Sequence, residues 1–110
     1  MADLKELKLR AGVCKRLLKE LKSYETEVEK DAAKVEDMKA RGADSHDIKQ
    51  QENVLAESRM MVPDCRKRLE TAYLDLQSAV DAAKDDLKLI ESQDFKDALD
   101  IVAEASEVVG

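Results

Sequence analysis

The single histidine of the chain, His46, lies beside residues that could build a catalytic triad with it. Its neighbours Asp44, Ser45 and Asp47 supply a hydroxyl and two carboxylates, which are the partners that a hydrolytic histidine uses. Near-consecutive residues at the start of a helix cannot easily point at one reacting atom, and the triad geometry requires that they do. We therefore expect a solvated turn with helix-capping residues here, and no catalytic residues in the chain.

Metal binding is the next chemistry to consider, because the chain also contains two cysteines and several acidic clusters. Cys14 and Cys65 lie on different predicted helices, far along the chain from His46, so the three residues lack the ligand spacing of a zinc site. The alternating acidic residues from Glu25 to Asp31, and the pair Asp85–Asp86, lack the Asp-x-Asp-x-Asp-Gly loop that calcium needs. We expect no metal ligands, and we interpret the acidic clusters as solvated helix faces.

Both cysteines fall on apolar positions of the predicted helices, where unpaired cysteines usually behave as small buried hydrophobic residues. If the turn between the helices centres near Ala43, residue 72 lies opposite Cys14. Cys65 is then roughly 10 Å away along the axis, which is too far for a disulfide. The start, MADLKELK, lacks the apolar region of a signal peptide, so we expect reduced thiols in the cytosol.

One surface feature could bind a partner, namely the methionine pair Met60 and Met61 next to Pro63. With Val62 at heptad position a, Met60 falls at f, which faces away from the apolar stripe, and Met61 falls at g. Flexible methionines beside a proline kink are an adaptable contact for a partner protein. In the alternative interpretation, Met61 fills the edge of the stripe and Met60 is an ordinary exposed apolar residue.

Charge and hydropathy argue against two other classes of partner. The chain has 25 acids against 19 bases and a net charge of −6, which disfavours nucleic acid despite the short basic run Arg66–Arg68. No run approaches 18 apolar residues, and the helices carry narrow apolar stripes rather than a wide lipid-binding face. We expect neither nucleic acid nor a membrane as a partner.

The elements that position these residues must be helices. The 110-residue chain is 40% charged and 44% hydrophobic, with only three Gly and one Pro to build turns, which excludes a many-stranded sandwich. Apolar residues recur at alternating spacings of three and four from Leu4 to Val35, with an interruption at Glu25, which predicts a first helix over about 3–41. Gly42 supplies the stop signal, and Asp44 or Ser45 supplies the next N-cap.

The second predicted helix has the most regular pattern, with an apolar residue at every seventh position from Ile48 to Ile90. This repeat predicts a helix over about 45–90 that packs as in a left-handed coiled coil. The pattern continues on both sides of Pro63, so we expect a kink there rather than a break. A capping sequence that begins at Ser92 then predicts a third helix over about 93–108.

These helices predict an all-α fold, an antiparallel up-down-up three-helix bundle that forms a single domain over 1–110. The apolar stripe of the second helix widens in its C-terminal half, so we expect a rod with one two-helix end and one three-helix end. Residues 1–22 carry seven bases and three acids, whereas residues 84–110 carry three bases and eight acids. Their attraction favours this topology, although each exposed pair contributes only about 0–1 kcal/mol.

The segment from Ile48 to Gln77, IKQQENVLAESRMMVPDCRKRLETAYLDLQ, resembles the tubulin-binding cofactor A family. Its core, Glu57 to Cys65, is a long and unusual string, and the stretch from Val13 to Glu20 in the first helix supports the match. Beyond Val80 the resemblance is compositional, apart from Asp94–Ala98. The family implies a three-helix bundle with a kinked second helix, in agreement with the periodicity.

The resemblance also implies a function. Such proteins are non-catalytic chaperones of the cytoplasm and cytoskeleton that capture β-tubulin, cooperate with further tubulin-folding cofactors, and need no nucleotide, metal or other cofactor. Pro63 provides the structural kink, and the partner-binding candidates, chosen by motif and position, are Glu57, Arg59, Met60, Met61, Asp64 and Arg66. The alternative function is a structural coiled-coil adaptor that acts by oligomerisation.

Overall fold

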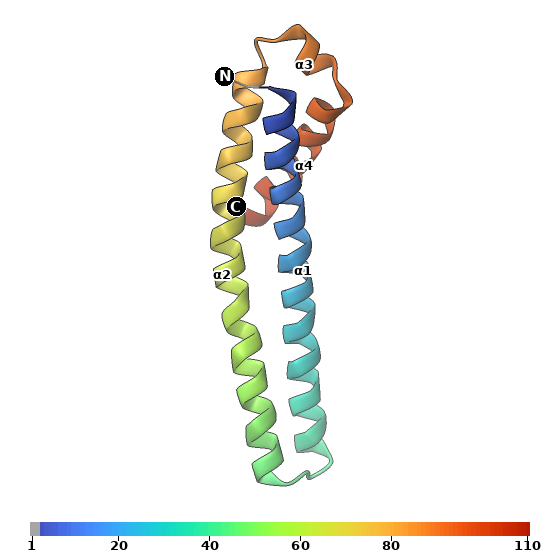
Figure 1. The fold of residues 1–110 in the computed structure, drawn as a ribbon. Helices are drawn as coiled ribbons and strands as arrows, with labels where there is room; N and C mark the ends of the chain where they lie inside the picture. The colour runs from blue at the N-terminus through green and yellow to red at the C-terminus, as the bar shows by residue number, and fades with distance from the viewer. Residues whose placement is uncertain (1–2) are drawn as a thin grey trace. The chain divides into compact units, whose positions relative to one another are not determined.

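The computed structural model describes residues 3–110, and this part of the chain is all-α, as the sequence predicts (Figure 1). No strand occurs among these residues. In the described residues four helices follow one another, where the sequence predicted three: α1 (Leu4–Ala40), α2 (Ser45–Ala83), α3 (Leu87–Glu91) and α4 (Gln93–Val109). None of the helices in the described part is long and apolar enough to cross a membrane.

The turn between α1 and α2 forms as predicted. Gly42 has a φ of 69°, in the left-handed region that glycine adopts without steric cost. The N–H groups of Gly42 and Ala43 donate to carbonyls of the last turn of α1 at 3.2 and 2.9 Å, the two bonds of a Schellman motif. The carboxylate of Asp44 accepts from the N–H of His46 at 2.7 Å, so the histidine lies in an exposed, capped turn.

The second helix ends earlier than predicted, because α2 stops at Ala83 and not at about residue 90. Asp86 is extended, and its carboxylate accepts from the N–H groups of Lys88 and Leu89 at 2.9 and 3.3 Å. A capping aspartate competes with helix continuation because its side chain satisfies the N–H groups of a new first turn. The seven-residue repeat therefore continues to Ile90 although the helix does not. Asp86 is a helix cap rather than part of a solvated helix face.

The third predicted helix is present as α4. The hydroxyl oxygen of Ser92 accepts from the N–H of Phe95 at 3.2 Å, which is the N-cap contact that the sequence signals. The same hydroxyl donates to the carbonyl of Leu89 in α3 at 2.6 Å. Ser92 thus closes α3 and opens α4, and these two helices contact each other.

The chain forms two compact units, each of which contains part of α1 and part of α2. The hairpin unit, Glu20–Cys65, consists of the end of α1 and the start of α2. The larger unit combines the residues up to Lys19 with Arg66–Gly110, and so contains the start of α1, the end of α2, α3 and α4. The expectation of a single domain over 1–110 stays a prediction.

The core of the larger unit draws on three helices. Leu69 and Leu76 of α2, Cys14 of α1 and Ala98 of α4 are all 0% exposed. The small side chain of Ala98 faces the core, whereas its neighbour Leu99 is 42% exposed. A short side chain at the contact allows two helices to approach closely, since the packing density of an interior leaves few voids.

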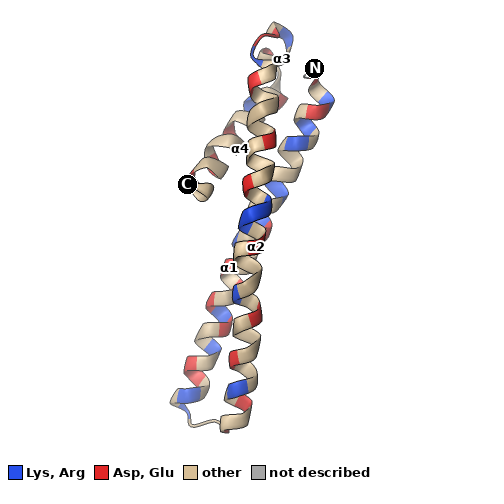
Figure 2. Cartoon of the chain, turned by 90° about the vertical axis from the view of Figure 1, so that its left-hand side faces the viewer, with Lys and Arg blue, Asp and Glu red and all other residues tan. Residues whose placement is uncertain are grey.

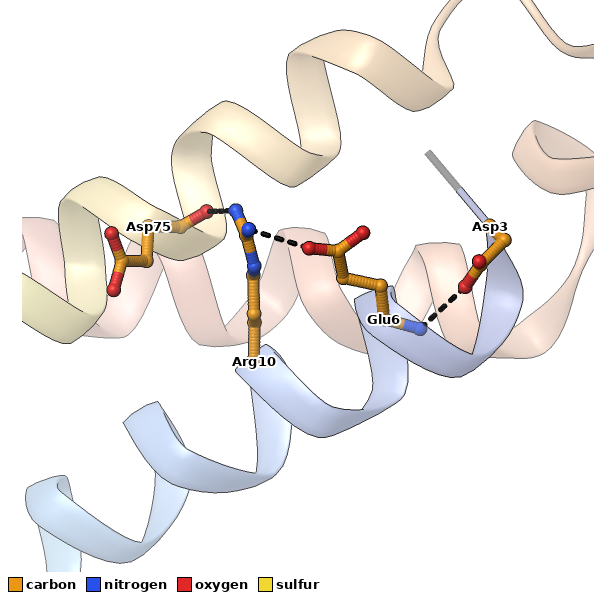
Figure 3. A network of polar contacts seen from close by, with 4 residues as sticks. All are labelled: Asp3, Glu6, Arg10 and Asp75. Atoms are coloured by element: carbon orange, nitrogen blue, oxygen red, sulfur yellow. Dashed lines mark hydrogen bonds and ion pairs between the residues drawn. The ribbon is translucent and has the colours of Figure 1, made fainter. Parts of the chain in front are cut away.

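Polar contacts tie the start of α1 to α2 within the larger unit (Figure 3). The carboxylate of Asp3 accepts from the N–H of Glu6 at 2.7 Å, and Arg10 donates to the Glu6 carboxylate at 2.5 Å. The other terminal nitrogen of Arg10 donates to the backbone carbonyl of Asp75 at 2.9 Å. This pairing of residue 10 with residue 75 agrees with the predicted antiparallel register, in which residue 14 lies opposite residue 72.

The hairpin unit has a narrower core, to which each helix contributes one stripe. All of its residues are described, and its buried apolar residues are Leu21, Val35, Met38, Leu55 and Cys65. Pro63 lies inside α2, which runs unbroken from Ser45 to Ala83, so the proline does not end the helix. A kink at this position stays a prediction.

Candidate interaction surface

Two methionines stand out on the hairpin unit because they are apolar and exposed. Met60 and Met61 are 71% and 40% exposed, whereas Leu55 on the same helix is 8% exposed. Leu55 and Cys65 mark the buried stripe of this part of α2, and the methionines lie outside it. The exposure of Met60 agrees with its f position, and that of Met61 argues against a role in filling the edge of the stripe.

Carboxylates flank Met60 on the surface of α2. Glu57, Met60 and Asp64 are spaced by three and four residues, which places them on one face of the helix, and all three are exposed. Val54, which is 44% exposed, precedes Met61 by seven residues and extends the apolar surface along that edge. The motif therefore presents a short apolar strip bordered by negative charge.

Arg59 belongs to a different feature of the same unit, a shallow pocket of about 350 Å³. Arg59 and Pro63 are exposed, while the valines of the pocket are half-buried. Two carboxylates from α1 share the pocket with the guanidinium group, so charges of both signs surround an apolar surface. The lining residues are Glu25, Val28 and Glu29 of α1 and Arg59, Val62 and Pro63 of α2.

Arg66 has an internal contact in the larger unit. Its guanidinium group donates to the backbone carbonyl of Val108 at 3.2 Å, in the last turn of α4. The last carbonyls of a helix lack intrahelical partners and carry partial negative charge, so a cation is stabilising there. This contact gives Arg66 a role in holding α4 to α2 that the motif did not suggest.

The hairpin unit also contains a buried polar pair that sequence reasoning missed. Asp31 is only 8% exposed, and the hydroxyl of Ser58 donates to its carboxylate at 2.5 Å. The interpretation of Asp31 as part of a solvated acidic face is therefore wrong. The spacing of Asp31 could have predicted its burial, since it lies seven residues from both Tyr24 and Met38, on the flank where apolar residues widen the stripe.

Opposite charges lie close together in the larger unit, as the charge segregation predicted. Figure 2 marks the positions of the basic and acidic residues along the helices. Lys8 and Lys15 of α1 line a groove of about 400 Å³ together with four carboxylates of α4. These carboxylates are spaced by three or four residues along one face of that helix: Asp94, Asp97, Asp100 and Glu104. The attraction between these opposite charges favours the packing of α4 beside the start of α1.

Both cysteines are buried, and neither of them forms a disulfide, as predicted. Burial, and secondarily the negative charge of Glu104, raise the pKa of the Cys14 thiol above its usual value. A thiol in this state is a poor nucleophile and a poor metal ligand. Among residues 3–110, no group of three or more His, Cys, Asp or Glu side chains could hold a metal ion.

Comparison with known proteins supports the resemblance seen in the sequence. Residues 2–102 match the family model described as tubulin binding cofactor A. The chain is 51% identical over 107 residues to tubulin-folding cofactor A of Arabidopsis thaliana, which covers 97% of this chain and 94% of that protein. It is 46% identical over 100 residues to tubulin-specific chaperone A of Homo sapiens, covering 89% of this chain and 90% of that protein.

Two solved structures share the fold. The crystal structure of tubulin folding cofactor A from Arabidopsis thaliana superposes with a TM-score of 0.87, covering 94% of this chain and 95% of that one at 51% identity. Human tubulin chaperone cofactor A superposes with a TM-score of 0.79, covering 94% and 97% of the two chains at 41% identity.

Proposed function

The chain belongs to the tubulin binding cofactor A family, and on this premise we propose that it is a non-catalytic chaperone that binds β-tubulin. In this role it holds β-tubulin in the cytosol until assembly with α-tubulin, and passes it to further tubulin-folding cofactors. It needs neither nucleotide nor metal, because its action is to cover a surface rather than to transform a substrate.

The observation that carries this proposal is the exposed apolar strip of the hairpin unit. Met60 is 71% exposed between the carboxylates of Glu57 and Asp64. Large apolar side chains at the centre of an interface supply most of its binding energy, while the charged groups around them set orientation and association rate. Methionine is suited to a partner that is not yet fully folded, because its unbranched side chain adapts to irregular surfaces.

The pocket beside Pro63 offers a second contact on the same unit. Arg59, Glu25 and Glu29 surround its half-buried valines, so a partner side chain that enters it meets both an apolar surface and charge. We assign Glu57, Arg59, Met60, Met61 and Asp64 to the β-tubulin surface. Arg66, the remaining candidate of the motif, belongs to the larger unit, where its contact with Val108 gives it a structural role.

The direct test removes the apolar contact without disturbing the core. Met60→Ser should weaken capture of β-tubulin from eukaryotic cytosol by about tenfold, since truncating a central apolar contact costs more than about 1 kcal/mol. The matched control is Leu74→Ser, because Leu74 is a similarly exposed apolar residue of α2, at 56%, in the larger unit. Capture is quantified with antibodies specific for β-tubulin, and circular dichroism checks that both variants remain folded.

The outcome also separates this function from that of an oligomerising adaptor. Loss of β-tubulin with Met60→Ser but not with Leu74→Ser supports the chaperone and its placement on the hairpin unit. Equal capture by both variants contradicts that placement. Abundant self-association without β-tubulin, measured by sedimentation, would instead support a structural adaptor.

A further inference from the structure

The oxidisable sulfur groups of the chain differ sharply in their access to solvent. Met60 and Met61 are 71% and 40% exposed, whereas Met38 is 8% exposed. Cys14 and Cys65 are 0% and 2% exposed. Of the sulfur groups in residues 3–110, only the two thioethers on the surface of α2 are open to a dissolved oxidant without a prior opening of the fold.

The chemistry of the groups reinforces this difference. A cysteine attacks a peroxide as its thiolate, and burial, with a smaller contribution from Glu104, raises the pKa of the Cys14 thiol and so disfavours the thiolate. A methionine thioether has no such requirement, because it reacts in its neutral form and access alone limits it. Exposure therefore directs oxidation to the methionine pair and away from both cysteines, and at Cys14 the raised pKa acts in the same direction.

We propose that Met60 and Met61 are a redox-modification site, at which a hydroperoxide converts the thioethers to sulfoxides and thereby weakens binding of β-tubulin. In this step a sulfur lone pair attacks the terminal peroxide oxygen, a sulfur–oxygen bond forms and the oxygen–oxygen bond breaks. The proton of the attacked oxygen passes to the leaving oxygen. The sulfur loses two electrons, and the peroxide is reduced to water or an alcohol. A methionine sulfoxide reductase reverses the change with two electrons from a dithiol.

The surroundings of the pair explain why the sulfoxide would oppose binding. Oxidation turns an apolar, flexible side chain into a strongly polar hydrogen-bond acceptor. Glu57 and Asp64, which share the face of Met60, are acceptors when ionised and cannot donate to it. A partner that covers the oxidised strip must then desolvate a polar oxygen without a new donor from this face, which opposes association. The binding half of the inference rests on the proposed function.

The first experiment tests the modification on the isolated chain and needs no tubulin. The protein is treated with dilute hydrogen peroxide, quenched with catalase, and digested for mass spectrometry. We expect Met60 to oxidise first, Met61 next, and Met38 at least tenfold more slowly than Met60. Oxidation of Met38 or of either cysteine at the rate of Met60 would overturn the inference, since the fold would then not direct the oxidant.

The second experiment tests the consequence for binding. Protein oxidised and desalted in this way should capture β-tubulin about tenfold less tightly, and treatment with methionine sulfoxide reductase should restore capture. A Met60→Leu, Met61→Leu double variant keeps Met1, Met38 and both cysteines. Whatever its own affinity, that affinity should be the same before and after peroxide, whereas Met38→Leu should still lose affinity on oxidation.

Capture of β-tubulin by unoxidised and by oxidised protein distinguishes a failure of this inference from a failure of the proposed function. Unoxidised protein that captures β-tubulin, and whose sulfoxide form captures it equally well, contradicts the redox effect and leaves the chaperone role intact. Unoxidised protein that does not capture β-tubulin contradicts the proposed function, and with it the effect on binding. If the Met60→Leu, Met61→Leu double variant also loses capture of β-tubulin on oxidation, another residue causes the loss. That result overturns the proposed site.

Discussion

The two units of the chain use α1 and α2 differently, although both helices run through both units. In the larger unit α2 is covered by α1 and α4, and Leu69 and Leu76 are 0% exposed. In the hairpin unit the same helix has a single partner, Ile48 and Val62 are only half-buried, and part of the contact is polar. A helix with one apolar stripe buries less surface than a helix with two, so the hairpin unit has less apolar stabilisation for its length.

This difference suggests a division of labour between the units. Surfaces that bind partners come preferentially from the less stable parts of a protein, since adaptation to a partner requires movement. The candidate β-tubulin surface, with Met60 and the pocket at Pro63, belongs to the hairpin unit. The larger unit then acts mainly as the stable part of the fold.

The largest expected effect is a difference between two leucines of α2. Leu69→Ala should lower the free energy of unfolding by about 2–5 kcal/mol, because Leu69 is 0% exposed in the core of the larger unit. Leu55→Ala, at an 8% exposed position of the hairpin unit, should cost less, since fewer neighbours surround the cavity. Urea denaturation followed by circular dichroism gives both values. Equal losses would show that the two cores are equally well packed.

Much of this architecture was predictable because it depends on local spacing. The turn at Gly42, the cap at Ser92 and the buried stripe from Leu7 to Leu21 each follow from residues within one or two turns of a helix, although Leu4, which the same spacing placed in the stripe, is 38% exposed. Such features need no knowledge of the tertiary fold. Sequence alone therefore located the first helix, the start of the second and the last helix.

The errors came from features that depend on three-dimensional packing. A straight helix drifts by about 20° per heptad from a strict seven-residue repeat, so the buried stripe of α1 moves toward the flank that contains Tyr24, Asp31 and Met38. Asp31 became buried through this drift. The early end of α2 depended on whether Asp86 caps a new helix or continues the old one, and both options suit an aspartate.

Only those features of the candidate site that depend on local spacing could be predicted from the sequence. The exposure of Met60 follows from its heptad position, which is local information. The inclusion of Glu25 and Glu29 in the pocket with Arg59 depends on how α1 and α2 align across the hairpin, and the motif carries no signal of it. The contact between Arg66 and Val108 likewise joins residues 42 positions apart.

The next largest effect concerns the polar pair of the hairpin unit. Ser58→Ala removes the hydroxyl that donates to Asp31 and leaves a buried carboxylate with one donor fewer, which should cost about 1–3 kcal/mol. Ser78→Ala is the control, since Ser78 is exposed on the same helix in the larger unit and should change stability by less than about 0.5 kcal/mol. Denaturant unfolding of Ser58→Ala, Asp31→Asn and the double variant gives the coupling energy. A coupling near zero would mean that the pair does not stabilise the hairpin.

A smaller gain in stability is expected from Pro63→Ala. The change restores an N–H that can donate to the carbonyl of Arg59 within α2, and we expect a gain of about 1 kcal/mol, because a native fold already accommodates its proline. If the proline kinks the helix and β-tubulin recognises the kinked surface, the variant should melt at a higher temperature and capture β-tubulin less tightly. A variant that melts higher with unchanged capture would separate the recognition surface from the proline.

The smallest effect is a pH dependence of stability from Cys14 in the larger unit. Burial, with a contribution from Glu104, raises the pKa of this thiol in the folded protein above its usual value of 9.0. Above that value the unfolded chain loses the proton more readily than the folded one, so stability falls as the pH rises through the interval between the two pKa values. The loss cannot exceed about 1.4 kcal/mol per pH unit, the limit for one proton.

Comparison with Cys14→Ser isolates this contribution, because every other titrating group is retained. The difference in free energy of unfolding between the original protein and the variant should be constant from pH 6 to about pH 8. As the pH rises beyond about 9, the original protein should lose stability relative to the variant. Urea denaturation at each pH measures it. A difference that stays constant to pH 10 would mean that the thiol ionises as readily in the folded protein as in the unfolded chain. The larger unit would then be open to water at Cys14, and its contrast with the hairpin unit would be lost.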